Sequence, residues 1–256
     1  MKDIKKYTDQ RGYLGHIDSN GNLEFGDSSA RTSFKEIANY LSGKPASKIY
    51  IMHLISRLRL NSGEYTRHWN GAMWSGKPGT MSRDNFLPLV VLMGFFDCKA
   101  LLKSSLWTLI KRGFFLWNTK AIGQQNDNWK IPDHGGFTLL IAYLRSFKSR
   151  FSYPILLLVD LVLLLNVIIR VIISRIDSDN VGDDLNLTLL LIQGSEIMPT
   201  PLLTLAKYIY KKFRLKAYVK CYGHPIHTAF AWYFRHDGAP PIDVLYYPLI
   251  KKYFKL

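Results

Sequence analysis

Residues Tyr153–Ile173 are the feature that most restricts what this chain can fold into. Sixteen of these 21 residues are Ile, Leu or Val. As one continuous helix rising about 1.5 Å per residue, the stretch would be about 32 Å long, enough to cross the hydrocarbon of a membrane. A chain carrying such a helix must place it in lipid, pack it against other helices, or do part of each.

Three placements of this stretch stay open. A transmembrane span is weakly favoured, because Asp160 removes about 3 kcal/mol from a larger aliphatic gain and Arg170 removes less. Basic residues before the stretch and acidic residues after it would put its N-terminal side in the cytoplasm. The alternatives are a helix buried at the centre of an all-α domain, where Asn166 and Arg170 would face polar partners, and a helix docked shallowly on a membrane surface.

The rest of the chain predicts an all-α fold, because no alternation of apolar and polar residues persists beyond a few positions. Turn chemistry at Asp18–Gly21 indicates a short hairpin or an irregular loop. Long loops are expected at 61–80 and 117–136, and an acidic linker at 177–184. We expect a single domain over 1–256, with 176–184 as the one place where it could divide. The other predicted helices are 30–41, 46–60, 83–96, 100–115, 137–147, 185–197, 202–220, 226–235 and a short one within 242–254.

The chain carries 34 Lys and Arg against 19 Asp and Glu, a formal net charge of +15. This surplus indicates an acidic partner: a glycan or other acidic polymer, an anionic membrane surface, or nucleic acid. Aromatic residues are interleaved with the main basic cluster, as in helices that lie on membranes and in proteins that bind single-stranded nucleic acid. A solvated face of a core helix explains the same pattern. The cluster consists of Lys207, Lys211, Lys212, Arg214, Lys216 and Lys220.

The expected location is cytoplasmic or membrane-associated. The first residues are basic, but no apolar run follows them, so we expect no secretory signal peptide. Two cysteines, Cys98 and Cys221, exclude a disulfide scaffold and agree with a reducing compartment.

Acidic residues stand at three junctions where a loop leads into a predicted helix. These are Asp27, Asp84 and Asp133, and Arg31, Arg83 and His134 lie beside them. If the three junctions converge, they form a cleft rimmed by tryptophans. Paired carboxylates with aromatic platforms suit glycoside cleavage, in which one acid protonates the leaving oxygen and one base activates water. Each acid is equally explained as a helix cap. The tryptophans are Trp69, Trp74, Trp117 and Trp129.

The segment Ser82-Arg83-Asp84-Asn85, after a Trp-rich loop and before an apolar helix, resembles the helix starts of (α/α)-toroid carbohydrate-active enzymes. With fewer helices than a complete toroid, the chain would be a helical array or an incomplete toroid. Most of the chain also resembles uncharacterised bacterial and phage proteins, through Gly26–Thr32, Ser82–Asp84 and Gly238–Ile242, and this resemblance implies no activity.

Taken together, these features lead to a glycan-acting hydrolase or lyase as the first functional hypothesis. Asp84 would be the acid or base, and Asp27 or Asp133 its partner. The substrate-binding residues would be Arg83, Arg31, His68 and His134, with Trp69 and Trp74 stacking on sugar faces.

Two other functions compete with this hypothesis. One is a non-catalytic membrane-associated protein, with Tyr153–Ile173 as anchor and a basic C-terminal face formed by Lys207, Lys211, Lys212, Arg214 and Lys216. The other is a non-specific nucleic-acid binder that uses the same basic residues.

The sequence predicts neither a metal nor a cofactor in the main site. Cys221, His224 and His227 have a spacing that zinc tolerates, with His236 or Asp237 as a fourth ligand, but ordinary loop histidines explain it as well. A Gly-rich phosphate loop and a dinucleotide fingerprint are both absent from the sequence.

Overall fold

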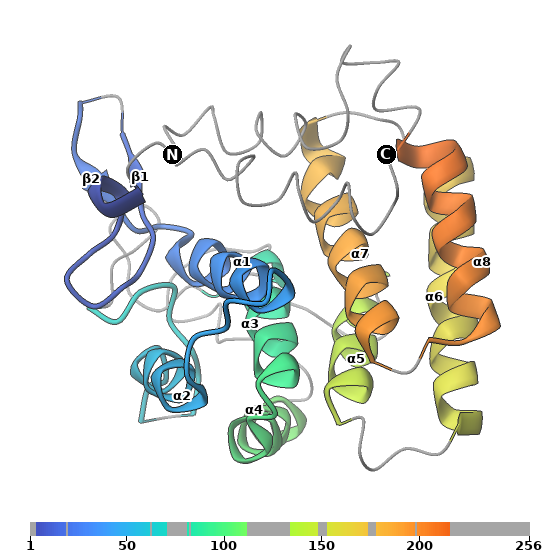
Figure 1. Cartoon of the computed structure of the whole chain (residues 1–256), viewed down its shortest axis with the longest axis horizontal. Helices are drawn as coiled ribbons and strands as arrows, with labels where there is room; N and C mark the ends of the chain where they lie inside the picture. Colours follow the sequence, from blue (N-terminus) through green and yellow to red (C-terminus); the bar gives the residue numbers. More distant parts are fainter. Residues whose placement is uncertain are drawn as a thin grey trace.

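The protein is described here from a computed structural model, which covers residues 4–18, 20–61, 63–70, 81, 83–111, 134–147, 153–173, 178–197 and 199–215. The fold is all-α, as predicted, with one small hairpin (Figure 1). The α-helices are α1 (Ser28–Leu41), α2 (Lys48–Arg57), α3 (Arg83–Phe95), α4 (Lys99–Lys111), α5 (His134–Ser146), α6 (Tyr153–Ile173), α7 (Ser178–Glu196) and α8 (Pro201–Ile209).

The N-terminal part is a 3₁₀ turn, η1 (Ile4–Tyr7), followed by two short strands. Strands β1 (His16–Ile17) and β2 (Leu23–Glu24) pair antiparallel, with Ile17 opposite Leu23. Gly21 in the connection has a φ of 83°, a conformation that glycine adopts without steric cost. The hairpin alternative at Asp18–Gly21 is therefore confirmed.

Helix α3 is the centre of the hydrophobic core. It packs against α1, α4, α5 and α7. Residues on all sides of α3 are buried, which explains why its sequence is apolar almost throughout. Each fully buried aliphatic side chain contributes about 1.5–3 kcal/mol through the hydrophobic effect. The fully buried ones are Leu87, Leu89, Val90, Val91, Leu92 and Met93.

The alternate helices α1, α3, α5 and α7 pack on one another in order: α1 on α3, α3 on α5, and α5 on α7. Helices α2 and α4 lie at one side of this series in Figure 1, and α6 and α8 form the opposite edge. Gly94 lets α3 and α5 approach closely, because a Cβ there would lie 2.8 Å from the Cβ of Ser146 and 3.0 Å from its Cα. The small residue therefore sets the spacing between two core helices.

Helix α6 has the predicted bounds, Tyr153–Ile173. Among the described residues it is the single helix long and apolar enough to cross a membrane. Its polar side chains point into the protein: Asp160 is ion-paired with Arg145 of α5, and Arg170 lies 3.8 Å from Asp184 of α7. Its opposite side exposes aliphatic residues. The helix is thus half-buried, so full enclosure by other helices is not what the structure shows.

The expected acidic linker at 177–184 is wrong from Ser178 onward, because α7 begins there. Asp179 and its neighbours suit a helix start, where the helix dipole favours negative charge. The predicted helix 202–220 begins at Pro201, with Thr200 as its N-cap accepting from the amide of Leu203. It changes at Tyr210 into a π-helical turn, η4 (Tyr210–Leu215). The predicted helices beyond residue 215 lie outside the described residues.

Candidate functional site

Asp27 precedes α1 but does not cap it with its side chain. Its carboxylate oxygen Oδ1 accepts a hydrogen bond from Arg67 Nη1 at 3.0 Å and another from Asn85 Nδ2 at 3.0 Å. Arg31, one turn into α1, places Nη2 3.7 Å from the other oxygen. Charged donors from α1 and from the loop before α3, together with an amide from α3, therefore fix the orientation of this carboxylate.

The starts of α1 and α3 lie together. The Ser29 hydroxyl donates to Asn85 Oδ1 at 3.0 Å, and the Ser29 amide donates to the Arg67 carbonyl at 2.8 Å. Asn85 lies in the first turn of α3, immediately after Arg83 and Asp84. Two of the three predicted helix starts thus converge, those that carry Asp27 and Asp84. We call Asp27, Ser29, Arg31, Arg67 and Asn85 the helix-start cluster.

The helix-start cluster is buried and rich in positive charge. The Arg31 side chain is 1% exposed and that of Arg67 8%, whereas Asp27 is 17% exposed. Among the described residues of the cluster, two guanidinium groups face one carboxylate. Two helix N-termini add partial positive charge at the same place. The buried polar side chains and the two helix N-termini make this a polar site.

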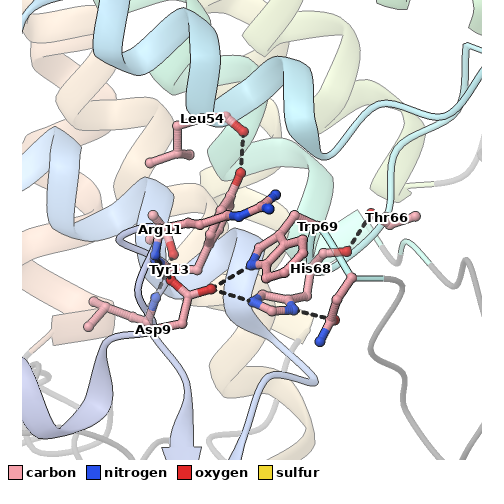
Figure 2. A network of polar contacts seen from close by, with 10 residues as sticks. Asp9, Arg11, Tyr13, Leu54, Thr66, His68 and Trp69 are labelled. Carbon is pink, nitrogen blue, oxygen red and sulfur yellow. Dashed lines mark hydrogen bonds and ion pairs between the residues drawn. The ribbon is translucent and has the colours of Figure 1, made fainter.

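Figure 2 shows a second polar network, which centres on Asp9. It adjoins the helix-start cluster along the chain, because His68 follows Arg67. Asp9 Oδ2 accepts from Trp69 Nε1 at 2.5 Å and lies 3.0 Å from His68 Nε2. Asp9 Oδ1 accepts from the amides of Arg11 and Tyr13 at 2.9 and 2.8 Å. One carboxylate therefore joins the N-terminal segment to the loop before α3.

The pKa of Asp9 lies below its ordinary value of 3.8. Burial alone would raise it, but hydrogen bonds from Trp69, Tyr13, Arg11 and His68 stabilise the charged form and outweigh burial. The pKa of the Tyr13 hydroxyl is raised by burial, and this hydroxyl donates to the Leu54 carbonyl of α2. The network thus also connects the N-terminal segment to α2.

The structure gives His68 and Trp69 partners within the protein. The second ring nitrogen of His68 contacts Asn70 Oδ1, and the ring stacks on Phe25 with centroids 4.2 Å apart. The Arg11 guanidinium covers one face of Trp69 at 3.6 Å. Both polar edges of His68 and one face of Trp69 are therefore occupied, which favours a positioning role for these two residues.

The predicted site residues fall into three groups. Asp27 and Arg31 belong to the helix-start cluster, and His68 and Trp69 belong to the Asp9 network. Only the backbone placement in a helix is described for Arg83, Asp84 and His134. Trp74, Trp117, Trp129 and Asp133 lie outside the described residues, as do Cys221, His224 and His227. Within the described part of the chain, no group of three His, Cys, Asp or Glu side chains could hold a metal ion.

Sequence reasoning did not assign Asp9, Arg11, Arg67 or Asn85 to a site. Two of these residues are neighbours of predicted site residues. Asn85 follows Asp84 directly, and Arg67 precedes His68, so their positions in the sequence could have identified them. Asp9 gave no such signal, because it lies 59 residues from His68 in the chain.

The basic cluster near α8 divides between surface and interior. Lys207, Lys211 and Lys212 are partly or fully exposed. Arg214 is buried instead, and its Nε and Nη2 donate to Asp184 Oδ2 at 2.9 and 2.7 Å. The buried carboxylate of α7 requires a cationic partner, which removes Arg214 from the expected surface. Lys216 lies outside the described residues.

Comparison of the chain with protein-family models, curated proteins and solved structures finds no match.

Proposed function

We propose that the helix-start cluster is the centre of a hydrolase or lyase that acts on an acidic glycan. The observation that carries this proposal is the Asn85 side chain, which donates to Asp27 and accepts from Ser29. This contact brings the first turn of α3, with Asp84, next to Asp27. General acid and base chemistry at a glycosidic bond requires two carboxylic acids, and we assign the second to Asp84.

The local geometry supports different roles for the two acids. Asp27 is fixed by Arg67 and Asn85 as an oriented acceptor, which suits a base or a nucleophile. Asp84 takes the role of the proton donor, with Asp133 as the alternative partner. Arg31 and Arg67 hold Asp27 in place. The binding roles proposed for Arg83, His134 and Trp74 are kept. No metal or cofactor is part of this proposal.

An incomplete (α/α) toroid belongs to the same proposal. Its support is the packing of α1, α3, α5 and α7 on one another, since alternate helices form the inner layer of such folds. The contact between the starts of α1 and α3 is also compatible with an inner layer.

The test measures release of reducing ends and of unsaturated products from a panel of neutral and acidic polysaccharides. Asp84→Asn and Asp27→Asn should each lower turnover about a hundredfold or more. Asp97→Asn is the matched control, because Asp97 is exposed at the end of α3, away from the helix-start cluster, and it should leave turnover unchanged. Full activity of Asp84→Asn, or no cleavage of any glycan by the wild type, would show that the proposal is wrong.

A further inference from the structure

Helix α6 exposes a continuous apolar stripe. Its members follow the 3–4 residue spacing of one helix face, within about a third of the helix circumference. Leu158 is 62% exposed, Leu165 50% and Ile172 74%. A stripe this long, on the outside of a folded protein, is typical of a surface that binds a partner. We define the apolar stripe as Ile155, Leu158, Leu161, Leu165, Ile169 and Ile172.

The polar side chains of α6 lie away from the apolar stripe, on the side of the helix that is buried in the protein. Asp160 is paired with Arg145 and accepts from the Thr200 hydroxyl, and Asn166 is also buried. Arg170 faces Asp184. These contacts fix the rotation of α6 about its axis, because turning the stripe inward would expose or unpair two buried charges. The exposed stripe is therefore a constant feature of the folded chain.

Helix α8 and the turn η4 pack beside α6 at one edge of the molecule (Figure 1). Their exposed side chains include basic and aromatic residues. Tyr208 and Phe213 are 56% and 48% exposed, and the ammonium of Lys212 lies 5.5 Å from the centre of each ring. Lys207 and Lys211 are partly exposed. The segment from Pro201 to Leu215 contains no acidic residue. We call Lys207, Tyr208, Lys211, Lys212 and Phe213 the basic face.

We propose that the apolar stripe and the basic face together bind the surface of an anionic bilayer, with α6 lying in the membrane plane. Aliphatic side chains on one side of a surface helix enter the boundary between headgroups and acyl chains. Lysines beside them attract anionic headgroups, and tyrosine and phenylalanine suit the interfacial region between them. The net charge of +15 adds a long-range attraction of the same sign.

Charge complementarity favours lipid over a second copy of this chain. A two-fold interface that included the basic face would bring two sets of lysines into one contact, and the segment from Pro201 to Leu215 has no acidic residue to neutralise them. A transmembrane position for α6 is also disfavoured. Asp160 and Arg170 could enter hydrocarbon only with their partners on α5 and α7, or unpaired at high cost.

The first experiment measures sedimentation of the full-length protein with vesicles. One set is pure phosphatidylcholine, and in the other about a third of the lipid is phosphatidylglycerol. We expect binding to the anionic vesicles and much weaker binding to the neutral ones. Leu158→Ser/Leu165→Ser should lower the partition coefficient on anionic vesicles by about tenfold or more, because both side chains leave the acyl region. Ile49→Ser is the matched control, since Ile49 is 70% exposed on α2, and it should bind as the wild type does.

The second experiment tests the basic face. Lys211→Gln/Lys212→Gln should lower binding to anionic vesicles about fivefold per lysine, and added salt should remove most of this difference. Far-ultraviolet circular dichroism checks that each variant is folded. Equal binding to both kinds of vesicle, or a stripe variant that binds as tightly as Ile49→Ser, would overturn the proposal.

The orientation and the alternative partner have their own readouts. Alkaline carbonate should release vesicle-bound protein, whereas retention would mean that α6 spans the bilayer. Light scattering should give the monomer mass. A dimer that the stripe variant abolishes would instead identify a second copy as the partner and overturn the membrane proposal. Asp84→Asn should bind vesicles normally, so failure of the glycan proposal leaves this one intact.

Discussion

Asp9 is the residue on which the order of the N-terminal segment depends. Its two carboxylate oxygens accept hydrogen bonds from two backbone amides and from the Trp69 indole, and one of them contacts the imidazole of His68 (Figure 2). An Asn at this position keeps the shape but turns an NH₂ group toward one of these donors. We expect Asp9→Asn to lower the free energy of unfolding at neutral pH by about 1–3 kcal/mol, because a hydrogen-bonded group is left unsatisfied.

The dependence of stability on pH tests whether the charge of the Asp9 carboxylate is responsible. The pKa of Asp9 is lower in the folded chain than its ordinary value of 3.8, so the stabilisation is complete above that value and is lost as pH falls below it. Urea unfolding of wild type and Asp9→Asn should therefore give a large difference at about pH 7 and a smaller one at about pH 3. A difference that stays constant over this range would contradict a role for the carboxylate charge. Asp97→Asn, which alters an exposed carboxylate, is the control.

Asp97 ends α3 in a left-handed conformation, with a φ of 52°. This conformation costs an L-residue about 1 kcal/mol or more and costs glycine little. The carboxylate lies 3.9 Å from Lys48 and 3.6 Å from Lys99, but exposed pairs contribute little. Asp97→Gly should raise the free energy of unfolding by up to about 1 kcal/mol. Asp97→Ala, which loses the same carboxylate without gaining conformational freedom, should lower it, and thermal unfolding separates the two.

At the scale of elements, periodicity and composition predicted much of the helix series. The bounds of α6 were predicted because a strongly apolar run, interrupted by Asp160 and Asn166, begins beside Pro154 and ends near Arg170 and Ser174. The start of α7 was missed, because Asp179, Asn180 and Gly182 resemble a linker when the helix contacts are unknown. Which side of α6 faces the protein also required the structure, since the partners of Asp160 and Arg170 are on other helices.

The candidate site was predictable to a smaller extent. The sequence marked Asp27 and Asp84 as standing at similar loop-to-helix junctions, but that the starts of α1 and α3 meet required the structure. The partners Arg67 and Asn85, and the involvement of Asp9 with His68, depend on contacts between residues far apart in the chain. Local sequence carries no information about such pairs.

The contact between α3 and α5 depends on Gly94. In Gly94→Ala, the new methyl group would overlap Ser146, whose Cβ and Cα would lie 2.8 and 3.0 Å away. We expect a loss of about 1–3 kcal/mol in the free energy of unfolding, because one of the two helices must shift. Ser146→Gly removes most of the overlap. The double variant should therefore lose less than the sum of the two single losses, and additive losses in chemical denaturation would argue against direct contact.

At the scale of the whole molecule, buried charges join the helices of the second half. Arg145 of α5 pairs with Asp160 of α6, while Arg170 of α6 and Arg214 of η4 both approach Asp184 of α7. Removal of one partner leaves the other charge buried and unpaired. Asp160→Leu should therefore lower the free energy of unfolding by about 3–5 kcal/mol, whereas Arg145→Met/Asp160→Leu should recover most of that loss.

The same variant shows whether the two halves of the chain unfold together. Helix α3 of the first half packs on α5 and α7, so the core is continuous across the segment at 176–184. Loss of Asp160 pairing should then destabilise α1 as much as α7, because one cooperative unit contains both. Hydrogen exchange measured by mass spectrometry should give equal losses of protection for peptides from these two helices. Loss confined to α6, α7 and α8 would show instead that the chain divides at 176–184, and calorimetry would then resolve two transitions.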